Sequence, residues 1–377
     1  MVVESVSTLD LRNLAALEVE LEPGLNLLWG PNGAGKTNLL EATYMALAGR
    51  SCRTRDDREA IAFGESLARV EAGVADGDRK RSFMCSVSRG AGRRHLVDGL
   101  PTGVETASLR PALAVFMPDR LALVKGPPAG RRAHLDGFCA ALWPARTETR
   151  RRYARALAQR NALLGRIRAG TAGLDGLDAW DQELATSAIG LIADRREATE
   201  LLAPEFARAA RGLGFGDAAT LGYRPRSDAG DPETLTAELR ERREADLARG
   251  YTGWGPHLDE LSLETGGRSL RRYGSQGQQR AALLALLFAE HRVLIDDGRP
   301  APLMLLDDVA SELDAEHRDL LVERLTAGGG QALVTATEPQ HLPRAGDRHE
   351  IAIRSGRALT AAPADGDAPA TERRAAA

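Results

Sequence analysis

The stretch Gly30-Pro31-Asn32-Gly33-Ala34-Gly35-Lys36-Thr37 matches the pattern G-x-x-x-x-G-K-[ST] at every fixed position. It follows an apolar run at residues 25–29, which is typical of a buried strand. It opens into residues 38–47, where apolar side chains recur at helical spacing. A chance glycine-rich turn before a helix would show the same composition, but the strand-loop-helix context favours a phosphate-binding loop.

Each residue type in this loop has a physical reason to be there. Glycines at positions 30, 33 and 35 allow backbone N–H groups to converge on a polyphosphate, and the following helix presents its positive end to the same anion. We expect Lys36 to reach the β- and γ-phosphates and the Thr37 hydroxyl to ligate Mg²⁺. Lysine occurs elsewhere only at positions 80 and 125, so its presence in the loop indicates a site that a guanidinium does not suit.

The composition limits the class of protein. The chain has 377 residues, enough for two domains or one domain with an insertion, and its 43% hydrophobic and 27% charged content is typical of a soluble globular protein. It contains no run of about 18 apolar residues and no apolar leader, so we expect a cytoplasmic protein with no membrane segment. Three widely spaced cysteines, 52, 85 and 139, argue against a zinc site. A net charge of −3 means that any DNA contact must come from a local basic patch.

Strand patterns dominate the first part of the chain. Alternating or apolar runs predict strands at residues 2–11, 17–21, 25–29, 68–74, 81–87 and 111–116, and Asp98-Gly99 predicts a hairpin turn. From about residue 126 to 250 the apolar residues instead keep a spacing of three or four, which predicts an arm of three or four helices. That segment is too short for a long coiled coil.

Beyond residue 250 the chain returns to alternating strands and helices. Ser275-Gln276-Gly277-Gln278 precedes an apolar helix, residues 302–306 predict a buried strand that ends in Asp307 and Asp308, and residues 331–337 predict another. The simpler interpretations are an N-capped helix and a strand end with solvated carboxylates. With the phosphate loop near one end and the acidic strand near the other, we expect one ATPase head from residues 1–125 and 251–360, an inserted arm at 126–250 and a disordered tail at 361–377.

The combined motifs resemble the ATP-binding-cassette (ABC) head of the SMC and DNA-repair ATPase superfamily, and in finer detail the RecF family of recombination mediators. The resemblance covers roughly residues 1 to 355. The residues that carry it are the phosphate loop with Asn38-Leu39-Leu40-Glu41-Ala42, Lys125-Gly126-Pro127-Pro128, Arg131-Arg132, Leu135-Asp136, Gly255-Pro256-His257 with Asp259, Ser275-Gln276-Gly277-Gln278-Gln279-Arg280 and Ser311-Glu312-Leu313-Asp314. The fold that it implies is α/β, with mixed sheets and helices, interrupted by a short helical arm.

The resemblance implies that ATP and Mg²⁺ are the cofactors and that ATP closes a homodimer. Residues 30–37 would bind the nucleotide, with Thr37 and Asp307 at the metal, and Lys36, Asp307 and Asp308 would act in hydrolysis. Ser275, Gln276 and Gly277 would complete the nucleotide site of a second copy. Asp308 stands where many such ATPases have Glu, so we expect a weak, DNA-dependent hydrolysis that serves as a switch. Transporter heads have a switch histidine after the last strand, and this chain offers Thr335 and Thr337 there instead.

The resemblance also implies a role in DNA replication, gap repair, recombination and the SOS response. The partners would be single-stranded DNA, gapped or junction duplex DNA, and the RecR and RecO proteins. Another ABC-type ATPase, either an SMC-like tether or a transporter energy-coupling head, is the alternative. Arg150, Arg151 and Arg152 belong to an arginine-rich stretch of the arm and are candidates for DNA contacts, although a solvated helix face explains them equally well. A packed side chain is the simpler interpretation of His257. Since aromatic residues make up only 4%, base stacking on single-stranded DNA is not supported.

Overall fold

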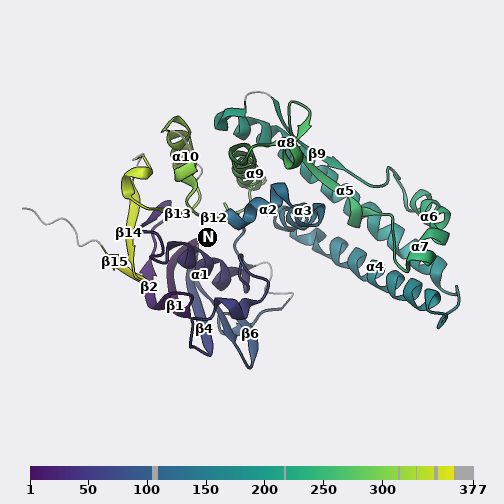
Figure 1. Cartoon of the computed structure of the whole chain (residues 1–377), viewed down its shortest axis with the longest axis horizontal. Coiled ribbons are helices and arrows are strands. Elements are labelled where there is room, and N and C mark those ends of the chain that lie inside the picture. Colours follow the sequence, from purple (N-terminus) through teal and green to yellow (C-terminus); the bar gives the residue numbers. More distant parts are fainter. Residues whose placement is uncertain (104–108, 216–217, 313–314, 328, 344–346, 361–377) are drawn as a thin grey trace, which may run out of the picture. The chain divides into compact units, whose positions relative to one another are not determined.

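The computed structural model describes residues 1–103, 109–215, 218–312, 315–327, 329–343 and 347–360, so the predicted tail at 361–377 lies outside the described residues. The chain divides into two compact units (Figure 1). We call Val2–Pro101 with the chain from Leu333 onward the P-loop unit, and Thr102–Ala332 the central unit. The predicted head and arm boundaries at residues 125 and 251 stay a prediction.

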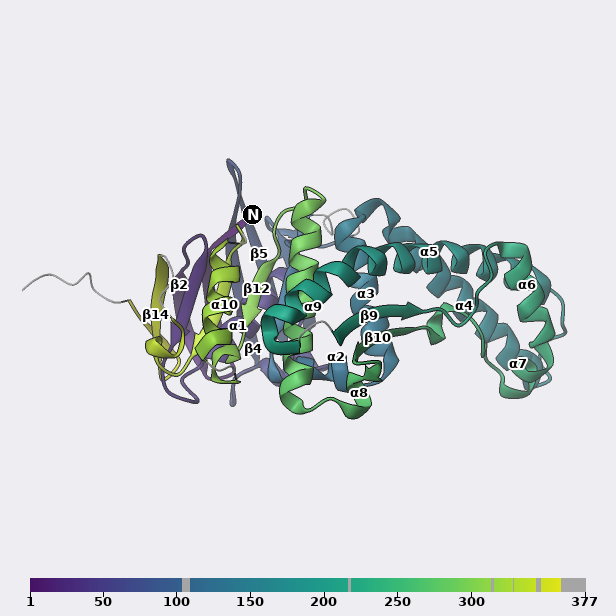
Figure 2. The same cartoon turned by 90° about the horizontal axis from the view of Figure 1, so that it is seen from above.

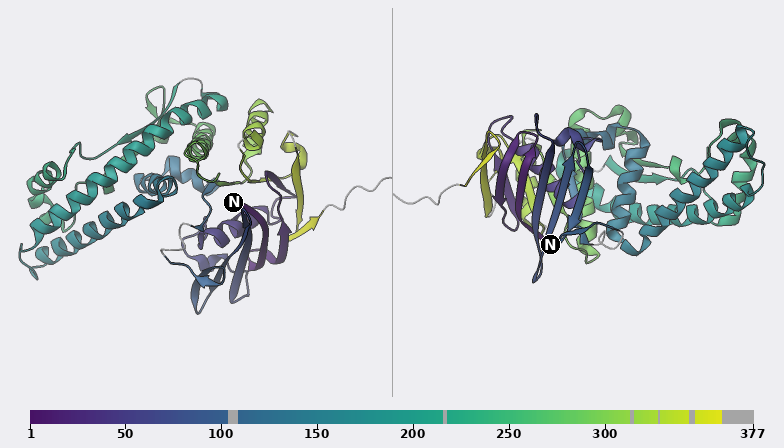
Figure 3. Two further views of the ribbon diagram at one scale, coloured as in Figure 1. Left: turned by 180° about the vertical axis from the view of Figure 1, so that it is seen from behind. Right: turned by 90° about the horizontal axis from the view of Figure 1, so that it is seen from below.

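The P-loop unit contains a six-stranded antiparallel sheet with the order β2-β1-β4-β5-β6-β7 (Figure 3). Alternation along β5, with Phe83, Cys85 and Val87 buried, gives the sheet one apolar face, and helix α1 packs on this sheet. The predicted hairpin turn at Asp98-Gly99 is confirmed, because both residues have positive φ, 51° and 78°. The bounds are β1 (Val2–Leu11), β2 (Leu14–Glu20), β4 (Leu67–Asp76), β5 (Arg79–Ser88), β6 (Gly92–Val97), β7 (Leu100–Pro101) and α1 (Lys36–Ala48).

The same unit holds four further strands in the order β15-β14-β3-β13, of which β3 and β13 are mostly buried. Strand β3 pairs in parallel with β14, whereas β14 pairs in an antiparallel manner with β15. Four of the five residues of β3 are buried, Asn26 among them, which agrees with the mainly apolar run that predicted the strand. The bounds are β3 (Leu25–Trp29), β13 (Ala332–Ala336), β14 (Arg348–Arg354) and β15 (Arg357–Thr360).

The central unit combines a parallel strand pair, a small antiparallel sheet and most of the helices. Strand β12 (Leu303–Leu306) pairs in parallel with β8 (Leu113–Phe116). Strands β9 (Ala219–Arg224), β10 (Glu260–Thr265) and β11 (Arg268–Ser269) form the antiparallel sheet. The sequence did not predict β9, because the helical spacing on either side of this short strand dominates the pattern. In the structure β9 pairs with β10 and packs against the helix α5 (Figure 2).

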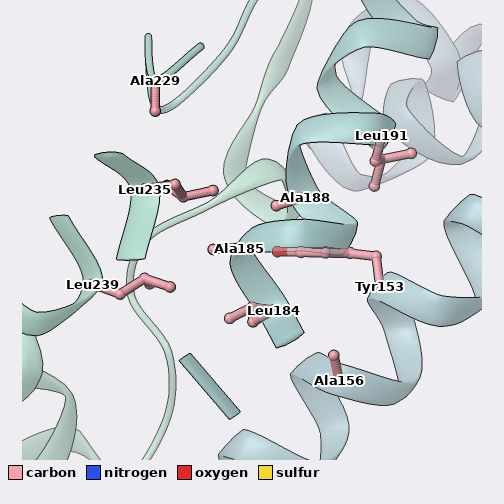
Figure 4. Packing of buried hydrophobic residues seen from close by; sticks show 9 residues of the cluster. All are labelled: Tyr153, Ala156, Leu184, Ala185, Ala188, Leu191, Ala229, Leu235 and Leu239. Carbon is pink, nitrogen blue, oxygen red and sulfur yellow. The ribbon is translucent and has the colours of Figure 1, made fainter. Parts of the chain in front are cut away.

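The predicted helical arm consists mainly of two long helices that pack together (Figure 2). The longer one, α5, has 34 residues and is therefore about 50 Å long at 1.5 Å per residue. Tyr153, Leu184 and Leu191 belong to its apolar core (Figure 4). The helices of this unit are α2 (Ala122–Lys125), α3 (Pro128–Leu142), α4 (Thr147–Arg168), α5 (Leu177–Ala210), α6 (Pro232–Glu241), α7 (Arg243–Arg249), α8 (Leu270–Tyr273), α9 (Gln276–Asp296) and α10 (Ala315–Ala327).

Several short helical turns lie between these elements. They are η1 (Asp57–Ala60), η3 (Pro118–Leu121), η4 (Pro144–Arg146), η5 (Arg211–Phe215), η7 (Pro256–Leu258), η8 (Val309–Glu312) and η9 (Pro339–His341).

All three cysteines are free, and burial raises the pKa of Cys85 and Cys139 to about 12, so these two thiols stay protonated at neutral pH. No helix in the described ranges is long and apolar enough to cross a bilayer.

A buried arginine fixes the arm internally. Arg160 of α4 is fully buried, and its guanidinium donates hydrogen bonds to Asp181 of α5 at 2.7 Å and to Asp246 of α7 at 2.8 Å. Both carboxylates are also fully buried. One buried cation therefore links three helices. Its removal would leave two buried acids without their main partner.

We predict that Arg160→Ala lowers the free energy of unfolding of the arm by about 3–5 kcal/mol, because Asp246 loses its buried guanidinium partner and Asp181 keeps only that of Arg243. Urea unfolding followed by tryptophan fluorescence measures this, since three of the four tryptophans lie between residues 143 and 254. The matched control is Arg155→Ala on the same helix, where both partners are exposed and a change within about 0.5 kcal/mol is expected. Equal costs for the two variants would contradict this account.

Candidate functional site

The predicted phosphate-binding loop has the backbone that its glycines suggest. Gly30, Gly33 and Gly35 all have positive φ, at 151°, 78° and 113°. A Cβ atom at Gly30 would lie 2.0 Å from the backbone oxygen of Ile353, so this position admits only glycine. At Gly33 a Cβ would meet nothing within 4 Å, and the tip of the loop from Pro31 to Gly33 is exposed. The loop is thus packed at its base and open at its tip.

Lys36 folds back over the loop. Its ammonium donates hydrogen bonds to the carbonyl oxygens of Gly30 at 2.7 Å and Pro31 at 3.0 Å. Lys36 and Thr37 are the first two residues of α1, and the first turn of this helix carries no acidic residue. The positive end of the helix is therefore not neutralised locally, and it is the type of end that binds phosphate.

Three neighbouring segments of the P-loop unit enclose the loop. The Asn13 side chain in the β1–β2 turn donates to the carbonyl oxygen of Gly33 at 2.8 Å. The N–H of Gly356, in the β14–β15 turn, donates to Ala34 at 2.8 Å, and the N–H of Gly30 donates to Ala336 at the end of β13 at 3.3 Å. No pattern in the sequence indicated Asn13 or Gly356, because both act on the loop from distant parts of the chain.

A buried carboxylate supports the helix that follows the loop. Glu41 of α1 is fully buried and accepts hydrogen bonds from the guanidinium of Arg12 at 3.0 and 3.1 Å. The Arg53 guanidinium and the Ser51 hydroxyl donate to the same carboxylate, at 3.2 and 2.5 Å. The network ties the β1–β2 turn, which carries Asn13, to the helix that begins with Lys36.

Thr335 and Thr337, which the sequence suggested in place of a switch histidine, flank Ala336 in the P-loop unit. Thr335 is buried in β13, and Thr337 follows Ala336, whose oxygen accepts from Gly30. The Thr337 hydroxyl is 2.8 Å from Nδ1 of His341. The sequence interpretation missed His341 because it lies four residues past Thr337. His341 is thus close to Thr337 and hydrogen-bonded to its hydroxyl group.

Asp307 and Asp308 follow β12, as the sequence predicted. Asp307 is buried and donates its backbone N–H to Phe116 of β8 at 2.8 Å, whereas Asp308 is exposed and has a φ of 50°. Such a left-handed conformation is uncommon for a residue with a side chain and often occurs at functional sites. Both acids line a small pocket of the central unit together with Arg280 of α9.

Helix α9 begins with a complete capping box. The Ser275 hydroxyl accepts from the N–H of Gln278 at 3.2 Å, and the Gln278 side chain accepts from the N–H of Ser275 at 3.0 Å. The interpretation as a capped helix is therefore correct, but it does not account for Gly277. A Cβ at Gly277 would meet only the Ser275 oxygen, at 4.0 Å, so nothing within the described chain requires glycine there.

The arm arginines proposed for DNA contacts are engaged with carboxylates. Arg152 of α4 pairs with Glu183 of α5 at 2.7 Å, Arg151 with Glu148 at 3.8 Å, and Arg150 with Asp136 at 3.5 Å. The sequence showed few acids near these arginines because Glu183 and Asp136 come from other helices. The DNA contact stays a prediction, and it must compete with these ion pairs.

His257 is packed, as the simpler interpretation held. Its Nδ1 is 2.6 Å from the Tyr153 hydroxyl and its Nε2 is 3.0 Å from the Thr252 oxygen. Burial lowers the pKa of His257, so the ring is neutral at pH 7. The motif Ser311-Glu312-Leu313-Asp314 cannot be placed, because residues 313 and 314 lie outside the described residues.

The structure thus groups the site residues by unit. The phosphate loop, Thr335 and Thr337 belong to the P-loop unit, with Ala336 bonded to Gly30. Asp307, Asp308 and the capped start of α9 belong to the central unit. No cluster of three or more histidine, cysteine or acidic side chains suited to a metal occurs in the described part of the chain.

Comparison with known proteins supports the family resemblance and the fold class. The family model described as an AAA domain matches residues 8–120. The DNA replication and repair protein RecF of Heliobacterium modesticaldum is 37% identical over 361 residues, which cover 92% of this chain and 96% of that protein. A solved structure of the recombination mediator RecF with ATP has a TM-score of 0.82 at 26% identity, covering 96% of this chain and 97% of that one.

The wider likeness concerns the fold alone. A solved SMC head, bound to the C-terminal winged-helix domain of ScpA, has a TM-score of 0.59 at 14% identity and covers 95% of this chain and 96% of that one. The predicted fold class, an α/β head of the ABC type with mixed sheets and a short helical arm, is confirmed.

We predict that Gly30→Ala lowers the free energy of unfolding of the P-loop unit by about 2–5 kcal/mol, because the new methyl group meets a backbone carbonyl and a left-handed φ. Gly33→Ala is the control in the same loop, with a similar sign of φ and open space, and should cost only about 1–2 kcal/mol. Thermal unfolding of both variants measures the difference. If Gly33→Ala proved the more damaging, the loop would not have the described packing.

Proposed function

Because the chain belongs to the RecF family of DNA replication and repair proteins, we propose that it is a recombination mediator that uses ATP to form a dimer on DNA. The observation that carries the proposal is the start of α9. There a capped, exposed helix presents Ser275 and a glycine that its own chain does not require. A glycine inside a helix costs about 1 kcal/mol relative to alanine, so a close approach from outside the chain accounts for it.

Gly30 through Thr37 bind the triphosphate of ATP. The loop offers its exposed tip, the amide groups at the start of α1 and the Lys36 ammonium, and the neighbouring turns hold it in shape before any nucleotide arrives. A RecF structure with ATP covers nearly the whole of this chain, which supports ATP as the nucleotide. Electrostatic binding by oriented N–H groups needs this kind of preformed loop.

Thr37 and Asp307 fit a magnesium ion chemically, since a hydroxyl and a carboxylate are the hard oxygen donors that Mg²⁺ prefers. When bound, the ion would neutralise charge on the phosphate oxygens. Lys36 stabilises negative charge on the transferred phosphoryl group, and Asp308 orients the attacking water. The side chain of Asp308 is shorter than that of glutamate, so hydrolysis is slow. This weak, DNA-dependent ATPase acts as a switch that ends the dimeric state.

Ser275, Gln276 and Gly277 complete the nucleotide site of a second copy. All three are exposed at the start of α9, where no acidic residue lies in the first turn. The capping box fixes the Ser275 hydroxyl and leaves the positive end of the helix available to an anion. Each copy therefore supplies one loop and one helix start, and two bound ATP molecules lie between the two chains.

DNA, single-stranded and as gapped or junction duplex, is the macromolecule on which the dimer acts in replication, gap repair and the SOS response. RecR and RecO are its protein partners. The related RecF that was solved with ATP is a recombination mediator of the RecFOR pathway, which supports this assignment. Residues 1–125 and 251–360 form the ATPase head and residues 126–250 the arm. Full-length similarity to RecF proteins disfavours the alternatives, a transporter head and an SMC-like tether.

We predict that Lys36→Met abolishes ATP binding and that Gly277→Ala abolishes only ATP-induced dimerisation. Gly277→Ala should keep the ATP affinity of each chain and stabilise the fold by up to about 1 kcal/mol, because alanine favours the helix and fits without a clash. Analytical ultracentrifugation with ATP, together with nucleotide binding and thermal unfolding, measures all three properties. An ATP-induced dimer of Gly277→Ala as tight as that of the unmodified chain would refute the role in the second copy.

We predict that the arm arginines, if they contact DNA phosphates, set part of the salt dependence of DNA binding. Replacing Arg150, Arg151 and Arg152 by alanine should reduce the slope of log affinity against log salt by about 2–3, which is roughly one unit per lost phosphate contact. A salt titration of DNA affinity with ATP present measures the slope. An unchanged slope would show that these arginines serve only their ion pairs within the arm.

A further inference from the structure

The segment around the start of α9 contains several arginines and no acidic residue. Residues 265–289 contain four arginines, 268, 271, 272 and 280, and their only acidic neighbours in sequence lie at the ends, at Glu264 and Glu290. The chain as a whole has a net charge of −3, so this segment opposes the overall balance. A segment that contains arginines and no acids of its own favours an anionic ligand, although Arg280 also faces Asp307 and Asp308 in the pocket described above.

An exposed aromatic side chain lies within this basic segment. Tyr273, the last residue of α8, is 69% exposed. Arg271 and Arg272 beside it are exposed, as are all residues from Ser275 to Gln278. Tyrosine and arginine are among the residues most enriched at the energetic centres of binding interfaces.

Buried and hydrogen-bonded residues fix the segment that carries Tyr273, so the exposure of its side chain does not reflect a loose loop. Leu270, at the start of α8, is fully buried, and its carbonyl oxygen accepts from the N–H of Gly274 at 3.1 Å and from the side chain of Gln279 at 2.8 Å. The capping box then fixes Ser275. A rigid element that presents an aromatic ring loses little conformational entropy on binding.

We propose that Arg272 and Tyr273 bind the nucleoside triphosphate held by a second copy of this chain. This inference rests on the proposed function, in which Ser275 and Gly277 reach the terminal phosphate of that nucleotide. Arg272 and Tyr273 extend the contact along the same molecule, the guanidinium toward phosphate oxygens and the ring toward the sugar and base. A nucleotide is favoured over nucleic acid because the two residues lie within three positions of Ser275 on one fixed element.

The contact also makes dimerisation depend on the whole nucleotide. The start of α9 contacts only the terminal phosphate, whereas the ring of Tyr273 offers a flat surface to a base. Two separate contacts to one ligand, both from the second copy, increase the selectivity of the closed dimer for a nucleoside triphosphate.

The test compares Arg272→Ala and Tyr273→Ala with Tyr251→Ala, which removes a second exposed tyrosine elsewhere in the central unit. Each variant keeps its own phosphate loop, so ATP binding per chain should stay within about twofold. The dissociation constant of the ATP-induced dimer should rise at least about tenfold for Arg272→Ala and Tyr273→Ala and stay unchanged for Tyr251→Ala. Unchanged dimerisation of both variants, measured by analytical ultracentrifugation, would overturn the proposal.

Two mixtures test whether the residues act on the other copy. Tyr273→Ala mixed with Lys36→Met can assemble one complete site, from the nucleotide of the first chain and the intact segment of the second. The unmodified chain mixed with the double variant Lys36→Met/Tyr273→Ala cannot. The first mixture should form at least about ten times more mixed dimer, and equal amounts would overturn the assignment.

Two further outcomes distinguish this inference from the proposed function and from a nucleic-acid surface. If the unmodified chain does not dimerise with ATP, the proposed function itself fails. If Arg272→Ala and Tyr273→Ala dimerise normally but lose retention of DNA in cosedimentation, the segment is a nucleic-acid surface and the inference is wrong. A normal dimer with normal DNA retention also overturns it.

Discussion

The two hydrogen bonds from the Lys36 ammonium to the carbonyl oxygens of Gly30 and Pro31 are the interaction on which the rest of the site depends. They hold a cation inside a loop whose glycines leave no side chains in the way. The same residue begins α1, so the ammonium and the positive end of the helix act on the same space. A polyphosphate would find both already in place, which lowers the reorganisation that binding requires.

The loop keeps this arrangement because distant segments hold it from several sides. Asn13 bonds to Gly33, and Gly356 bonds to Ala34. Glu41, fully buried, joins α1 to Arg12 beside Asn13, which makes the turn and the helix one packed structure. The start of α9 shows the opposite pattern. It is capped and anchored, yet its residues from Ser275 to Gln278 are exposed in the described chain, as expected of a surface that meets a second molecule.

The sequence predicted the features that depend on local residue types. The loop, the turn at Asp98-Gly99 and the capped start of α9 follow from glycine, aspartate and serine at particular positions. It could not predict features that depend on tertiary contacts. Strand β9 forms because β10 and α5 pack against it. The arginine-rich face of α4 looked unpaired because the acid for Arg152, Glu183, comes from α5. Asn13 bonds to the loop, and His341 bonds to Thr337, from segments with no motif.

In the proposed dimer, α9 of one chain meets the phosphate loop of the other chain when ATP is bound. The most direct measurement places a photoreactive amino acid at Gln276 in a tagged copy and mixes it with an untagged copy of distinct isotopic mass. With ATP, mass spectrometry should find the cross-link in residues 30–37 of the untagged copy, and without ATP that cross-link should be absent. Cross-links confined to the tagged copy itself, or independent of ATP, would contradict the account.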